Sequence, residues 1–166
     1  EELSQDITDF KETVDSYEKD SVKSSDKDTL ETLIEKIETA QDDKNLSESQ
    51  KEKLQELLEE VKVLVDIIDE KKQKLDDLVS EVESLDEETV NENDQEQFNQ
   101  LKEELSSIID ESNQHYTDAE KENAQKQLDQ IAKLEDILEE LSQDITDFKE
   151  TVDSYDKDSF KSSDKD

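Results

Sequence analysis

SESQKEKLQELLEEVKVLVDIIDEKKQKLDDLVSEVESL (Ser47–Leu85) is the stretch that decides the fold. Apolar residues recur in it at alternating spacings of three and four, which is the pattern of one face of a long α-helix. The positions are Leu54, Leu57, Val61, Leu64, Ile68, Lys71, Leu75, Leu78, Val82 and Leu85, and only Lys71 breaks the pattern. Ser47 followed by Gln50 is a capping box, so we expect the helix to begin there.

Further helices on both sides follow the same logic. Thr117 and Glu120 form a second capping box ahead of another long helix. Its apolar face carries Leu128, Ile131, Leu134, Leu138, Leu141, Ile145, Phe148, Val152 and Tyr155. Leu3, Ile7, Phe10, Val14 and Tyr17 predict a half-length helix at the start of the chain. Two short helices are predicted between them, from about Asp28 (Leu30, Leu33, Ile34, Ile37) and from about Asp94 (Phe98, Leu101, Leu105, Ile108), with Ser25 or Asp26 and Asn93 or Asp94 as N-caps.

The chain also repeats itself. EELSQDITDFKETVDSYEKDSVKSSDKD (Glu1–Asp28) returns at Glu139–Asp166 with two changes, Glu18 to Asp156 and Val22 to Phe160. Weaker matches, such as Leu64 with Leu134 and Val22 with Val90, halve that interval and give a unit of about 69 residues. We therefore expect a segment of a tandem array.

Composition limits the possible functions. The net charge is −33, from 53 acidic and 20 basic residues, and every basic residue is Lys. Nucleic acid is excluded as a partner because no basic stripe could contact phosphates, and no apolar run is long enough for membrane insertion. With 28% hydrophobic residues, the chain can bury narrow stripes but not a wide core. Gly, Pro and Cys are absent, so the turns must use Asp, Asn and Ser.

Alternation of long and short helices predicts the architecture. A short antiparallel helix covers only half of a long one, so each long helix should serve two bundles. The prediction is an all-α, elongated rod of tandem three-helix bundles that share long continuous helices. We assign residues 1–67 to the first bundle, 68–138 to the second, and 139–166 to the start of a third, truncated unit. A rise of about 1.5 Å per residue gives about 30 Å per unit and a rod of about 80–90 Å. Lys71 falls at the predicted junction between bundles.

Catalytic or metal chemistry finds little support in the residues. The single histidine, His115, lies at the predicted end of a short helix, where a loop or capping role is expected. Zinc binding and nucleophilic catalysis both need His or Cys partners that the chain does not supply. Asp20, Ser24, Asp26 and Asp28 (repeated as Asp158, Ser162, Asp164 and Asp166) loosely suggest a calcium loop but lack its glycine. We predict no enzyme activity, no catalytic or metal-ligating residues and no cofactor.

Period, long–short alternation and acidic, Lys-only composition together give a resemblance. The chain resembles spectrin-type repeats, and it is similar to the helical repeat regions of large Gram-positive cell-wall-anchored surface proteins. That resemblance implies an extracellular stalk on the bacterial cell surface, which holds an adhesive domain away from the wall. The expected partners are neighbouring repeats of the same chain, with an end-to-end or C-terminal-helix dimer as a further possibility.

The alternative is a module that binds a host protein, since three-helix bundles on Gram-positive surfaces also resemble albumin- and immunoglobulin-binding modules. Such a module needs exposed apolar residues outside the helix–helix stripes. The candidates are Val63, Val65, Ile67 and Val79, and only Ile67 keeps its apolar character in the repeat, as Ile137.

Overall fold

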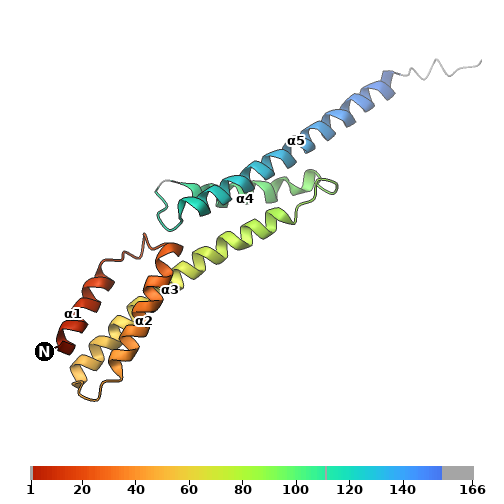
Figure 1. Cartoon of the computed structure of the whole chain (residues 1–166). Coiled ribbons are helices and arrows are strands. Elements are labelled where there is room, and N and C mark those ends of the chain that lie inside the picture. The colour runs from red at the N-terminus through yellow and green to blue at the C-terminus, as the bar shows by residue number, and fades with distance from the viewer. Residues whose placement is uncertain (1, 111, 155–166) are drawn as a thin grey trace, which may run out of the picture.

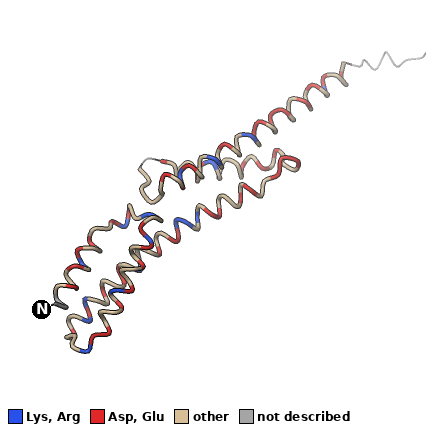
Figure 2. Tube along the Cα trace, viewed as in Figure 1, with Lys and Arg blue, Asp and Glu red and all other residues tan. Residues whose placement is uncertain are grey.

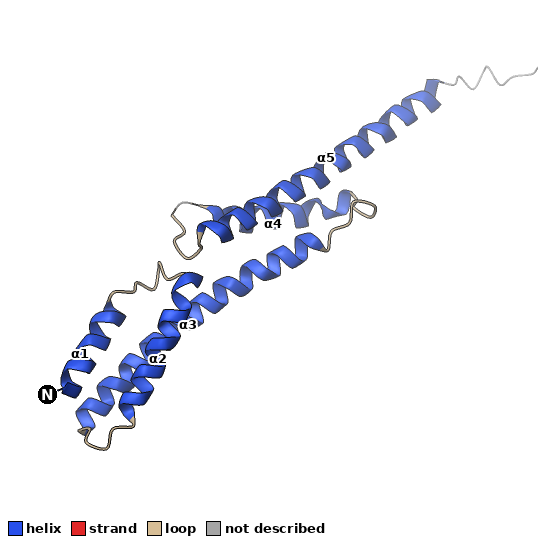
Figure 3. Ribbon diagram, viewed as in Figure 1, coloured by secondary structure: helices blue, strands red, loops and turns tan. Residues whose placement is uncertain are grey.

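The chain is all-helical over the part that the computed structural model describes, which is residues 2–110 and 112–154 (backbone alone for residues 2–4). Its helices are α1 (Glu2–Asp15), α2 (Lys27–Gln41), α3 (Glu48–Glu83), α4 (Gln95–Ile109) and α5 (Asp118–Ser154). Consecutive helices pack antiparallel, and α3 and α5 are about twice as long as the others (Figures 1 and 3). The predicted order of one half-length, one short, one long, one short and one long helix is confirmed.

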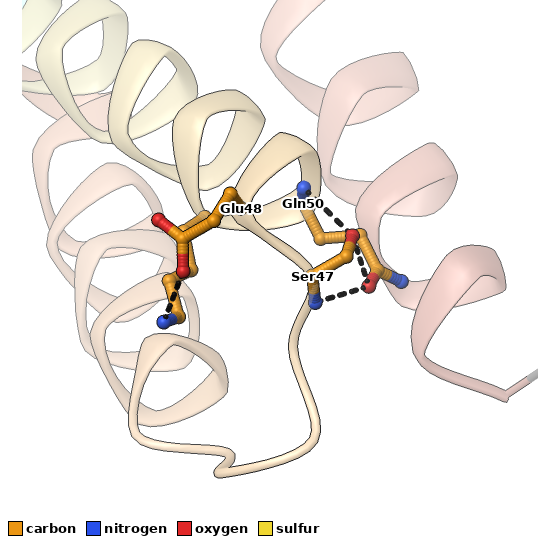
Figure 4. Close-up of polar contacts among 4 residues, drawn as sticks. Ser47, Glu48 and Gln50 are labelled. Carbon is orange, nitrogen blue, oxygen red and sulfur yellow. Dashed lines mark hydrogen bonds and ion pairs between the residues drawn. The ribbon is translucent and has the colours of Figure 1, made fainter.

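Both predicted capping boxes are present. At the start of α3, the Ser47 Oγ accepts a hydrogen bond from the Gln50 N–H at 3.3 Å, and the Gln50 Oε1 accepts one from the Ser47 N–H at 2.9 Å (Figure 4). At the start of α5, Thr117 and Glu120 make the same two bonds, at 3.3 and 2.8 Å. Each pair satisfies two N–H groups that the first turn of a helix leaves without a partner.

The short helices begin differently from the prediction. Ser24–Asp26 and Glu92–Asp94 form 3-10 turns that run into α2 and α4. Asp26 and Asp94 are the N-cap residues, as predicted, but neither side chain bonds to its own helix. Instead each carboxylate accepts the N–H three residues back, at 2.9 Å from Lys23 and 2.8 Å from Asn91. Each of these polar loops is therefore closed by a hydrogen bond between its own residues.

Two buried clusters follow one another along α3. The first core joins α1, α2 and the first half of α3, and includes Ile7, Leu33 and Ile68. The second core joins the rest of α3 to α4 and the first half of α5, and includes Leu75, Phe98 and Ile131. Between them, Lys71 is half-buried. The helix α3 is therefore continuous, but its apolar face is interrupted at Lys71 and contributes to two separate cores.

Four loop residues also belong to these cores. Val22 and Val90 lie in the loops that precede α2 and α4, and both are buried. Leu46 and Tyr116 lie just before α3 and α5 and are buried as well. Each pair occupies equivalent repeat positions, so every short helix is held at its start, and every long helix at its cap, by one buried side chain.

Candidate functional site

Side chains with potential catalytic or metal-binding chemistry are scattered over the surface. Figure 2 shows acidic residues along every helix, with Lys residues interspersed among them. Within residues 2–110 and 112–154, no three His, Asp or Glu side chains come close enough to hold a metal ion. Of the calcium-loop candidates, Asp26 accepts the Lys23 N–H, and the copies at Asp158 to Asp166 lie outside the described residues.

His115 lies in the loop between α4 and α5, and its ring reaches the first half of the molecule. The Nδ1 atom is 3.3 Å from the carbonyl oxygen of Val22, in the loop before α2. The neighbouring Tyr116 is 3% exposed in the second core, and burial raises the pKa of its hydroxyl, with a smaller contribution from Glu120. His115 therefore lies in a loop, as expected from the sequence, and connects this loop to the loop before α2, a contact that the sequence did not predict.

Hollows on the surface are open grooves between neighbouring helices. One groove between α1 and α2 is lined by Asp9, Phe10, Thr13, Thr32, Leu33 and Lys36. Another, between α3 and α4, is lined mainly by carboxylates and amides with Lys74. The Thr13 and Thr32 hydroxyls in the first groove donate to backbone carbonyl oxygens of their own helices, those of Asp9 and Asp28, each at 2.8 Å.

Ion pairs and hydrogen bonds connect the two helices of each hairpin. Glu135 of α5 accepts hydrogen bonds from Lys102 of α4 at 2.7 Å and from Gln95 at 2.9 Å. Burial by itself would raise the pKa of Glu135, but these two donors outweigh burial and hold that pKa below its usual value. Lys27 contacts Asp69 across the α2–α3 hairpin, and this contact raises the pKa of Lys27.

The residues considered for host-protein binding are mostly involved in packing. Val65 packs against the first core, Val79 and Ile137 pack against the second, and Ile67 is half-buried. Only Val63 of this set is exposed, at 40%. A single exposed valine does not make the aromatic, multi-residue patch that dominates binding energy at protein interfaces.

Among the residues that the structure describes, the largest exposed apolar feature lies on the second half of α5. Leu141, Ile145, Phe148 and Val152 are 47, 53, 70 and 50% exposed. We call these four residues the α5 stripe. They follow one another at spacings of four, three and four, so they share one face of the helix. In Figure 1 this half of α5 extends beyond the other helices. Tyr155, which would continue the stripe, lies outside the described residues.

Comparisons with known proteins do not assign this geometry to a family. No family model, no curated protein and no solved structure matches the chain. Among the described helices, none combines the length and the apolar character that crossing a bilayer requires. The class defined by the structure is therefore that of an all-helical protein with long antiparallel helix packing.

Proposed function

We propose that this chain is a structural spacer, a rod of tandem three-helix bundles joined through shared helices in the manner of spectrin-type repeats. The observation that carries the proposal is that one uninterrupted helix, α3, contributes to both buried cores. A helix shared in this way fixes the direction from one bundle to the next. The unit boundaries near 67 and 138 belong to this proposal.

Several features suit a spacer. Repeated units add length in proportion to their number, because each contacts only its neighbours. The net charge of −33 disfavours side-by-side packing of rods and contact with anionic surfaces. The resemblance to repeat regions of Gram-positive cell-wall-anchored proteins would place the spacer between a cell wall and an adhesive domain. The chain itself would then carry no catalytic step.

Small-angle X-ray scattering tests the proposal. The first half of α3 followed by all of α5 gives a length of about 85 Å at 1.5 Å per residue. A rod of that length has a radius of gyration of about 25 Å, whereas a compact domain of the same mass has about 15 Å. Inserting one further unit, a copy of residues 71–139, should lengthen the maximum dimension by about 30 Å. A compact particle, or no increment, would rule out the spacer.

A further inference from the structure

The α5 stripe belongs to a sequence that occurs elsewhere in the chain with a different burial. Residues 139–154 are identical to residues 1–16. In α1, the counterparts of Ile145 and Val152 are Ile7 and Val14, which are only 8 and 5% exposed. One sequence is therefore covered in one place and uncovered in another. The cause of the difference lies in what packs beside the helix.

Two elements cover this face in α1. The first core brings Ile7 and Val14 together with Leu33 of α2 and Leu58 of α3, and Phe10 packs against it. A weak electrostatic attraction also connects α1 with α3. Lys11 bonds chiefly to Asp15 on its own helix, and Glu60 of α3 adds a smaller attraction. The partner of this face is thus the antiparallel hairpin formed by α2 and the first half of α3, residues 27–68.

The second half of α3 buries the equivalent face in the same way. Leu75, Leu78 and Val82 are the repeat equivalents of Ile7, Phe10 and Val14, and all three are buried. The hairpin of α4 and the first half of α5 covers them in the second core. Both covered copies of the stripe are therefore packed against a short helix followed by the first half of a long helix.

Charge disfavours pairing of two α5 stripes with each other. The segment 139–154 carries six acidic residues and a single Lys149. Two such helices side by side would repel along their whole length. The α2–α3 hairpin offers Lys36 beside the position of Phe10, and this lysine lines the α1–α2 groove. The hairpin of residues 27–68 is also acidic overall, with twelve carboxylates against six lysines, so charge alone does not select it. The hairpin is selected because residues 139–154 are identical to residues 1–16, and α1 packs on this hairpin.

We propose that the second half of α5 is a docking surface for the α2–α3 hairpin of a second copy of this chain, in the position that α1 of that copy otherwise occupies. The contact is heterologous, because it joins the far end of one copy to the near end of the next. It does not close on itself, so it links copies head to tail. The proposal rests on the same repeat packing as the proposed spacer, but its test measures binding between copies, so it can fail while the rod dimensions and the increment per unit hold.

Residues 139–154 of one copy must compete with α1 of the other copy for the α2–α3 hairpin. Each copy has two matching helices, α1 and residues 139–154, for one α2–α3 hairpin. The α1 helix is tethered to that hairpin by a short loop, which gives it an effective concentration of about 1 mM. Unmodified copies should therefore be monomeric at micromolar concentration, and a copy whose α1 no longer competes should become an acceptor.

The first experiment builds such an acceptor in the full chain. Ile7→Asp and Phe10→Asp vacate the hairpin, and Ile145→Asp with Phe148→Asp remove the acceptor's own docking face. Sedimentation velocity of the acceptor mixed with the unmodified chain should show a 1:1 complex, with each partner monomeric alone. A chain that carries only Ile145→Asp and Phe148→Asp, with α1 unchanged, should bind the acceptor at least about tenfold more weakly than the unmodified chain does. It would bury a charge where an apolar side chain otherwise docks. Absence of a complex with a helical acceptor overturns the proposal.

The second experiment leaves α1 unchanged. It therefore tests the proposal even if the acceptor of the first experiment proves to be unfolded. The chain contains no Cys, so introduced thiols are unique. Because Glu60 of α3 adds to the electrostatic attraction on Lys11 of α1, a flexible bis-maleimide should cross-link Lys149→Cys in one copy to Glu60→Cys in another. Gln130→Cys is the matched control, because it is the equivalent position in the α4–α5 hairpin, which the continuous α3 covers permanently.

Preferential cross-linking to position 60 supports the proposal. Equal cross-linking to positions 60 and 130 overturns it. So does a predominance of Lys149→Cys homodimers, which would show that the stripes of two copies pair with each other instead.

Discussion

At the residue scale, one side chain stands out in the second core. Gln127 of α5 is 7% exposed, and its Oε1 has no hydrogen-bond partner among the described residues, while its Nε2 donates to Asn123 at 3.3 Å. The equivalent residue in the first core is Leu57, which is buried among apolar neighbours. A buried polar atom without a partner lowers stability, since it has lost its hydration without replacement.

Gln127→Leu should therefore raise the free energy of unfolding by about 1–2 kcal/mol, because it removes the unpaired oxygen at nearly constant volume. Thermal unfolding followed by circular dichroism should show an increase of about 2–4 °C per kcal/mol for a chain of this size. The matched change is Leu57→Gln, which should lower stability in the first core. A gain from both substitutions would contradict the explanation.

Glu135 gives a pH-dependent prediction at the same scale. Its pKa is lower in the folded than in the unfolded chain, so its contribution is fully present above the unfolded pKa and is lost as pH falls through the folded pKa. Glu135→Gln should therefore lower stability at pH 7, and the difference from the unmodified chain should shrink below about pH 4.5. Urea unfolding at a series of pH values measures this difference. Exposed Glu140→Gln is the control and should show no comparable trend.

At the scale of elements, the starts of the long helices are the most sharply specified points. Ser47→Ala removes one capping acceptor from α3 and should cost about 1 kcal/mol. Thr117→Ala should cost a similar amount at the start of α5, because the same two bonds are made there. Ser49→Ala, two residues into α3, is the control. It should be neutral or slightly stabilising, since alanine favours a helix. Chemical unfolding compares the three, and a cost at Ser49 equal to that at Ser47 would argue against the capping role.

The elements also show how far sequence analysis reaches. The spacing of apolar residues predicted all five helices, and the capping boxes predicted where α3 and α5 begin. The end of α4 was placed about five residues too late, because Asp110 leaves the helical conformation and its carboxylate accepts the Ser112 N–H at 2.7 Å. Val22 and Val90 were recognised as a repeated pair but not as core residues. Their signal was an apolar residue recurring inside an otherwise polar loop.

At the scale of the whole molecule, charge opposes compactness. With a net charge of −33 and narrow cores, mutual repulsion among carboxylates should be the main electrostatic effect on stability. The ion pairs seen between helices are largely exposed, and exposed pairs contribute only about 0–1 kcal/mol each. Screening should therefore remove more repulsion than attraction.

The midpoint of thermal unfolding should accordingly rise as NaCl increases from about 10 mM to 1 M, over which the Debye length falls from about 30 to 3 Å. Calcium and magnesium chloride should act alike at equal ionic strength, because the described residues hold no cluster suited to a specific site. Differential scanning calorimetry provides the measurement. A fall in the midpoint with salt would contradict the argument, as would a rise specific to micromolar calcium.

The sequence by itself determined the helices, their caps, their order and their repeat, because these depend on residues within one or two turns of each other. Only the tertiary structure decided which apolar faces are covered. Residues 1–16 and 139–154 are identical, yet Ile7 is buried and Ile145 is exposed. The unpaired Gln127 and the contact of His115 with Val22 likewise appear only when distant segments meet. Periodicity specifies that a helix has an apolar face, whereas burial of that face depends on a partner that lies far away along the chain.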